Sequence, residues 1–68
     1  MKYLIIIEKA NNNYSAYIPD VPGCIATGKT PEIVKREILK ALEMHLKGMV
    51  EDGLEIPQPM ALADYVGV

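Results

Sequence analysis

The residue pattern with the most specific chemistry runs from Gly23 to Thr30 and reads Gly-Cys-Ile-Ala-Thr-Gly-Lys-Thr. It fits the phosphate-loop pattern, in which backbone N–H groups surround phosphates, a lysine reaches their terminal oxygens and a hydroxyl binds Mg²⁺. The segment from Met60 to Asp64 also superficially resembles an apolar strand that ends in a metal-binding aspartate. These residue types therefore raise the hypothesis of a nucleotide site.

The surroundings of this pattern argue against a nucleotide site. A phosphate loop has its meaning only between a buried parallel strand and a helix, whereas Gly23 follows a proline turn and residues 24–27 themselves have the composition of a strand. Pro31 removes a backbone donor from the helix end that would bind phosphate. A chain of 68 residues is also short for a parallel nucleotide-binding sheet. We therefore expect no nucleotide and no cofactor.

The only histidine and the only cysteine are the next candidates for catalysis. His45 falls within an apolar helical pattern, where a packing role is commoner than base catalysis. No second ligand stands at metal-binding spacing from His45, and Cys24 has no CxxC partner. The sequence leaves a nucleophile–base pair of Cys24 and His45 open but favours a structural cysteine on a strand.

Three carboxylates, Glu8, Asp20 and Asp64, supply an alternative hypothesis of a metal-dependent nuclease. Metal-assisted hydrolysis needs several converging carboxylates, and these three are far apart in the sequence. The prediction is therefore a protein without a metal site and without catalytic activity.

Composition and charge favour a small binding protein. Half of the 68 residues are apolar, and the net charge is −2, which argues against a sequence-independent grip on nucleic acid and suits a partner with a basic surface. The apolar run Tyr3–Ile7 is too short for a membrane span or a signal-peptide core. A single cysteine indicates a reducing compartment, so we expect a cytoplasmic protein.

The elements that position these residues follow from the hydrophobic pattern. Residues 3–8 are rich in β-branched side chains and predict a strand that, being apolar on both faces, lies centrally in its sheet. Asn11–Asn13 predict a tight turn into an antiparallel strand at residues 14–18. Residues 24–27 predict a third strand, and residues 62–68, centred on Tyr65-Val66, a fourth.

A long helix is predicted between the third and fourth strands. Thr30 and Pro31 are typical of a helix start, and Gly53 of the residue just after its end. The expected fold is therefore α+β, a single βββαβ domain over residues 1–68 with one helix packed on a small mixed sheet. One helix covers only one face, so we expect a second copy to cover the other face, in a homodimer or higher homo-oligomer. The helix face predicted to pack inward comprises Val34, Ile38, Ala41, Leu42, His45 and Met49.

The segment between the second and third strands is a proline-rich turn. Pro22 presets its own φ and Gly23 is free to take a positive φ. We predict that the turn fixes an exposed edge of the sheet beside Tyr17, an aromatic residue of the type that interfaces favour. The alternative is that Pro22 and Gly23 serve the turn alone. The candidate partner-binding residues are Tyr17, Pro19, Asp20, Pro22 and Gly23.

The segment Tyr14–Cys24, with its Pro-Asp-Val-Pro-Gly-Cys core, resembles the signature of the HicB-like antitoxin family. The similarity continues through Ala26–Glu32, Ala41–Leu46 and Ile56–Pro59, and covers nearly the whole chain. The resemblance implies a partial ribonuclease H-like fold of order βββαβ without catalysis.

The resemblance also implies a protein partner, a HicA-like toxin. Such toxins are small ribonucleases that cleave mRNA, and the antitoxin blocks their catalytic surface. Many family members carry a C-terminal DNA-binding domain; this sequence ends at Val68, so we expect no direct contact with nucleic acid. A different class of function, an orphan oligomeric scaffold or ligand-binding module, stands as the alternative.

Overall fold

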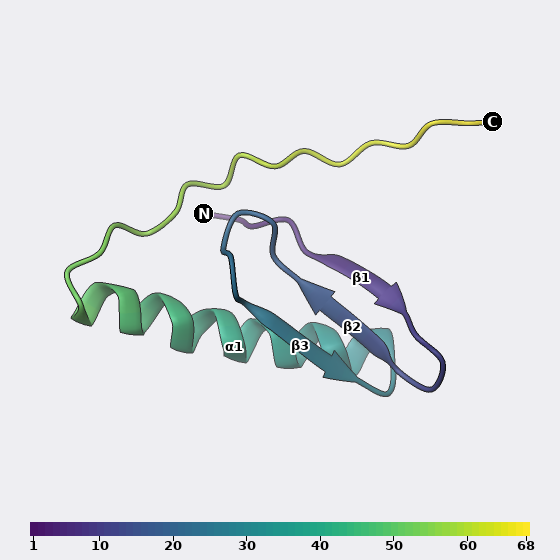
Figure 1. Ribbon diagram of the computed structural model, residues 1–68, viewed down its shortest axis with the longest axis horizontal. Helices are drawn as coiled ribbons and strands as arrows, with labels where there is room; N and C mark the ends of the chain where they lie inside the picture. The colour runs from purple at the N-terminus through teal and green to yellow at the C-terminus, as the bar shows by residue number, and fades with distance from the viewer.

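The computed structural model describes all 68 residues and contains β1 (Ile6–Lys9), β2 (Tyr14–Tyr17), β3 (Ile25–Gly28) and α1 (Pro31–Glu51). The strands form one antiparallel sheet in the order β1-β2-β3. Helix α1 packs against β2 and β3 on one face of this sheet, so the molecule has two layers (Figure 1). The α+β class is thereby confirmed.

The central position predicted for the first strand is wrong, because β2 lies in the middle and β1 lies at an edge. Strand β1 also begins at Ile6 rather than at Tyr3. The partner strand β2 ends at Tyr17, which pairs with Ile6. The next residue, Ile18, uses its backbone N–H and carbonyl for hydrogen bonds within the following turn. Residues 3–5 consequently have no strand beside them.

The fourth strand predicted at residues 62–68 is absent, and the chain after α1 forms no helix or strand. This segment passes the N-terminal residues and then runs out beyond the sheet (Figure 1). The tyrosine and β-branched residues there are compatible with a strand, but a strand exists only where a neighbour completes its hydrogen bonds. Within this chain the segment has no such neighbour.

The helix has the ends that were predicted. Thr30 Oγ1 accepts a hydrogen bond of 3.1 Å from the N–H of Ile33, and Pro31 is the first helical residue. After the helix Gly53 has φ +73°, a conformation that glycine adopts without steric cost. The cap and the stop together define a helix of 21 residues.

The core lies between α1 and the adjoining half of the sheet. It contains two helix residues, Val34 and Ile38, and four residues from β2 and the turn after it. Along one face of the sheet Ile7, Ala16 and Ala26 are paired across the strands, and Ala16 is buried beneath the helix. The buried core residues are Ala16, Ile18, Val21, Cys24, Val34 and Ile38.

Candidate protein-binding site

The segment between β2 and β3 consists of two consecutive β-turns. The N–H of Val21 donates to the carbonyl of Ile18 at 3.0 Å, and the N–H of Cys24 donates to the carbonyl of Val21 at 3.1 Å. Pro22 and Gly23, with φ +86° at the glycine, occupy the central positions of the second turn, as a type II turn requires. Ile18, Val21 and Cys24 are buried, so this turn is part of the core and has a rigid base.

Four of the five predicted partner-binding residues are exposed around this rigid turn: Tyr17, Pro19, Pro22 and Gly23. Asp20 is half-buried and has a partner within the chain. Its Oδ2 accepts hydrogen bonds of 3.0 Å from the N–H groups of both Met60 and Ala61. The structure therefore gives Asp20 an internal function, which is to hold the C-terminal segment at the turn.

A row of apolar side chains crosses the sheet next to this turn, on the face opposite the helix. Ile6 pairs with Tyr17, and Tyr17 pairs with Ile25, so the three side chains lie side by side across all three strands. Ile25 is 70% exposed and Tyr17 is 40% exposed. We call Ile6, Tyr17 and Ile25 the apolar row. The sequence alone pointed only to Tyr17, because the row is created by strand register.

The nucleotide hypothesis has no support in the geometry of Gly23–Thr30. Four of these residues form β3, an antiparallel strand, and the hydroxyl of Thr30 caps the helix. A methyl group on Gly28 would lie 2.8 Å from the backbone nitrogen of Val34. Gly28 therefore allows β3 and α1 to approach closely, which explains the glycine without a phosphate.

Cys24 and His45 do not form a nucleophile–base pair. Cys24 is buried, and this burial raises the pKa of its thiol above the ordinary value, which disfavours the reactive thiolate. The half-buried His45 lies under the turn, where its Cε1 would be 3.9 Å from a methyl group on Gly23. Both residues have the packing roles that the sequence favoured, but Cys24 lies at the end of the turn before β3 and not on the strand itself.

The hypothesis of a metal-dependent nuclease rests on three carboxylates that would have to converge. No three His, Cys, Asp or Glu side chains gather closely enough to hold a metal ion, so Glu8, Asp20 and Asp64 do not converge as that hypothesis requires. The carboxylate of Asp20 is occupied by two backbone N–H groups.

The chain also has no helix with the length and apolar character needed to cross a membrane.

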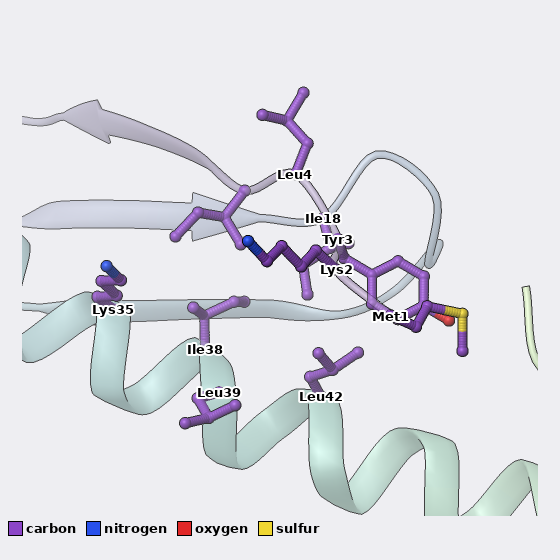
Figure 2. A pocket seen from close by; sticks show the side chains of 10 residues that line it. Met1, Lys2, Tyr3, Leu4, Ile18, Lys35, Ile38, Leu39 and Leu42 are labelled. Carbon is purple, nitrogen blue, oxygen red and sulfur yellow. The ribbon is translucent and has the colours of Figure 1, made fainter. Parts of the chain in front are cut away.

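A second surface, not identified from the sequence, is an apolar groove of about 520 Å³ between the N-terminal segment and α1. Helix α1 lies over β2 and β3 and leaves the side of β1 open. Figure 2 shows Ile38 and Leu42 pointing from the helix toward the N-terminal residues. The groove is lined by Met1, Lys2, Tyr3, Leu4, Ile5, Ile18, Lys35, Ile38, Leu39 and Leu42.

Comparison with known proteins identifies the family. Residues 3–67 match the model of the family described as HicB_like antitoxin of bacterial toxin-antitoxin system. The chain therefore belongs to the HicB-like antitoxin family, as its resemblance indicated.

Relatives of similar sequence occur in a phage, a bacterium and an archaeon. An uncharacterised 14.9 kDa protein of Haemophilus phage HP1 is 38% identical over 66 residues, which cover 97% of this chain and 50% of the phage protein. A UPF0150 protein of Helicobacter pylori is 39% identical over 72% of this chain and 68% of its own length. A UPF0150 protein of Thermoplasma acidophilum is 31% identical, with 90% of each chain covered. No solved structure gives a significant match.

Proposed function

We propose that this member of the HicB-like antitoxin family neutralises a HicA-like, mRNA-cleaving toxin by direct protein–protein contact, and that it does so without catalysis of its own. The observation that carries the proposal is the exposed apolar row beside the rigid turn. Monomeric proteins rarely leave such surface exposed without a binding role. The net charge of −2 suits a ribonuclease, which needs basic surface for its RNA.

The contact surface that we propose combines the apolar row with the turn. Tyr17 belongs to both: it lies in the middle of the row and immediately precedes the turn. Pro19, Pro22 and Gly23 present a fixed backbone shape, because the turn is anchored in the core by its buried residues. A surface of this kind loses little conformational entropy on binding. Because the toxin's substrate is mRNA, we propose that the complex forms in the cytoplasm.

The direct test is capture and inhibition of the small protein encoded next to this gene. The purified chain is titrated into that protein, and binding is measured by calorimetry while RNA cleavage is followed. We expect a stoichiometric complex and loss of cleavage at equivalence. Absence of a complex, or a neighbouring protein without ribonuclease activity, contradicts the proposal.

Two substitutions locate the contact surface. Ile25→Glu places a charge on the apolar row, and Tyr17→Ala removes its central ring. Central interface residues cost about 2–4 kcal/mol when truncated, so each variant should bind the toxin about 30-fold or more weakly. Met44→Glu is the matched control, because Met44 is 75% exposed on the helix and outside the proposed surface. Equal affinity for all three variants would exclude this face.

We further propose that the chain self-associates as a homodimer or higher homo-oligomer. The supporting observation is the second apolar surface, the groove beside β1, which is separate from the apolar row. An orphan scaffold, as the alternative function, would retain this self-association and show no toxin binding.

A further inference from the structure

Two segments of the chain have the residue composition of strands but no strand beside them. Residues 3–5 precede β1 at the edge of the sheet, and residues 62–68 form the C-terminal segment. Neither segment takes part in the backbone–backbone hydrogen bonds of the molecule. Unpaired edges of this kind are templates for another strand.

The C-terminal segment is held at its base and free beyond it. Tyr3 donates its hydroxyl hydrogen to the carbonyl of Pro57 at 2.5 Å, and Asp20 binds the N–H groups of residues 60 and 61. Beyond these anchors Leu62, Tyr65 and Val66 are 95%, 97% and 93% exposed. The segment therefore runs on from a defined point beside the turn (Figure 1). Seven residues in an extended conformation reach about 20 Å.

The groove complements this segment in chemistry. Eight of its ten lining residues are apolar, and its two charged residues are Lys2 and Lys35. Residues 62–68 are apolar except for one charged residue, Asp64. Because alternate residues of a strand share a face, Leu62, Asp64 and Val66 would point to the same side.

We infer that residues 62–68 of one copy add as a strand to residues 3–7 of a second copy, with Leu62, Asp64 and Val66 directed into the second copy's groove. Strand addition to an open edge is an established mode of recognition. A reciprocal exchange gives a twofold dimer in which both edges are paired.

The exchange also supplies enough contact area for a stable dimer. Each C-terminal segment directs Leu62, Val66 and Val68 toward the groove, while Tyr65 lies on the opposite face of the added strand. A tyrosine contributes about 150–250 Å² when buried, and counted over both faces of two added strands the buried surface is on the order of 1,200 Å², the lower end of specific interfaces. This inference rests on the self-association part of the proposed function and is independent of the toxin.

The first test measures molar mass by light scattering for the full-length protein over a wide range of concentration. We expect a dimer for the natural sequence and a dissociation constant about a hundredfold or more higher for Val66→Asp, because a charge would enter the apolar groove. Val66 is almost fully exposed within one chain, so this substitution leaves the fold of the single chain intact. Met44→Asp, which alters an exposed helix residue outside the groove, is the matched control and should remain dimeric.

The second test identifies the pairing partners. Asp64→Lys and Lys35→Glu each place like charges together and should weaken the homodimer. An equimolar mixture of the two variants should form a heterodimer, because the lysine introduced in one exchanged segment meets the glutamate introduced in the other copy's groove. Amide hydrogen exchange should show protection at residues 3–5 and 62–66 in the natural dimer, and loss of that protection in Val66→Asp.

Several results would overturn the inference. A protein that is monomeric at all concentrations has its C-terminal segment free or folded onto its own edge, and a dimer unaffected by Val66→Asp uses another surface. The toxin proposal is tested separately, because Ile25→Glu should reduce toxin binding while the molar mass stays that of the dimer. If the toxin proposal fails, toxin binding is absent or is unaffected by Ile25→Glu, and the dimer is still found.

Discussion

Gly28→Ala tests the reason for the glycine that made the sequence resemble a phosphate loop. The added methyl group would lie 2.8 Å from the backbone nitrogen and 3.0 Å from the Cα of Val34. Val34 is fully buried in the core and lies in the first turn of α1. Because the clash is with backbone, rotation of a side chain cannot relieve it, and β3 and α1 must move apart.

The expected magnitude follows from overpacking of a close contact. Extra methyl groups in packed interiors cost about 1–3 kcal/mol, which corresponds to a fall of about 4–8 °C in Tm for each kcal/mol in a domain of this size. The conformation of Gly28 does not require glycine, since its φ is not positive. The whole loss of stability is therefore steric.

Gly48→Ala is the matched control, with the same chemical change at a position in α1 where a methyl group would meet nothing within 4 Å. Alanine in a helix interior is about 1 kcal/mol more favourable than glycine, so this variant should be more stable than the natural protein. Urea unfolding at one fixed protein concentration measures both variants, because the proposed dimerisation would make stability concentration-dependent. A Gly28→Ala protein as stable as the natural one, or two variants that change in the same direction, would refute the packing argument.

Three further predictions concern the cap, the anchor and the thiol. Thr30→Ala removes the acceptor for the Ile33 N–H and should cost about 1 kcal/mol in urea unfolding, whereas Thr30→Ser should be close to neutral. Asp20→Ala removes the acceptor of the Met60 and Ala61 N–H groups, so hydrogen exchange at these two amides should become faster; unchanged rates would show that the anchor is not formed. Cys24 should react with a thiol reagent only on unfolding, because it is buried. Rapid labelling of the native protein would contradict this burial. The pKa of the Cys24 thiol is raised in the folded state, so its titration does not affect stability at neutral pH. Stability should fall as pH rises above about 8.5, the ordinary thiol pKa, because the unfolded chain then loses the proton first.

The local features of the fold could be predicted from the sequence because they depend on neighbouring residues. The helix start at Thr30 and Pro31 and the stop at Gly53 are set by chemistry within a few positions. The turn at Pro22-Gly23 follows from the two residues that form it. The partner-binding function assigned to the exposed residues of this turn stays a prediction.

The features that could not be predicted depend on register and on distant contacts. The apolar row exists because Ile6, Tyr17 and Ile25 are paired across three strands, and no single segment shows it. The function of Asp20 depends on Met60 and Ala61, which lie 40 and 41 positions further along the chain. The phosphate-loop pattern failed for the same reason, since the requirement for Gly28 comes from contact with the helix.

The two errors in strand prediction have a common physical cause. Hydrophobic pattern and β-branched residues show which segments are able to form strands, and both residues 3–5 and residues 62–68 have that ability. Pairing needs a neighbour, and β2 leaves the first segment without one when the chain turns at Ile18. The C-terminal segment, anchored at Asp20, passes out beyond the same sheet. If the two segments are each other's partner in a second copy, both strand predictions describe the dimer, and the single chain shows only the part that it can complete alone.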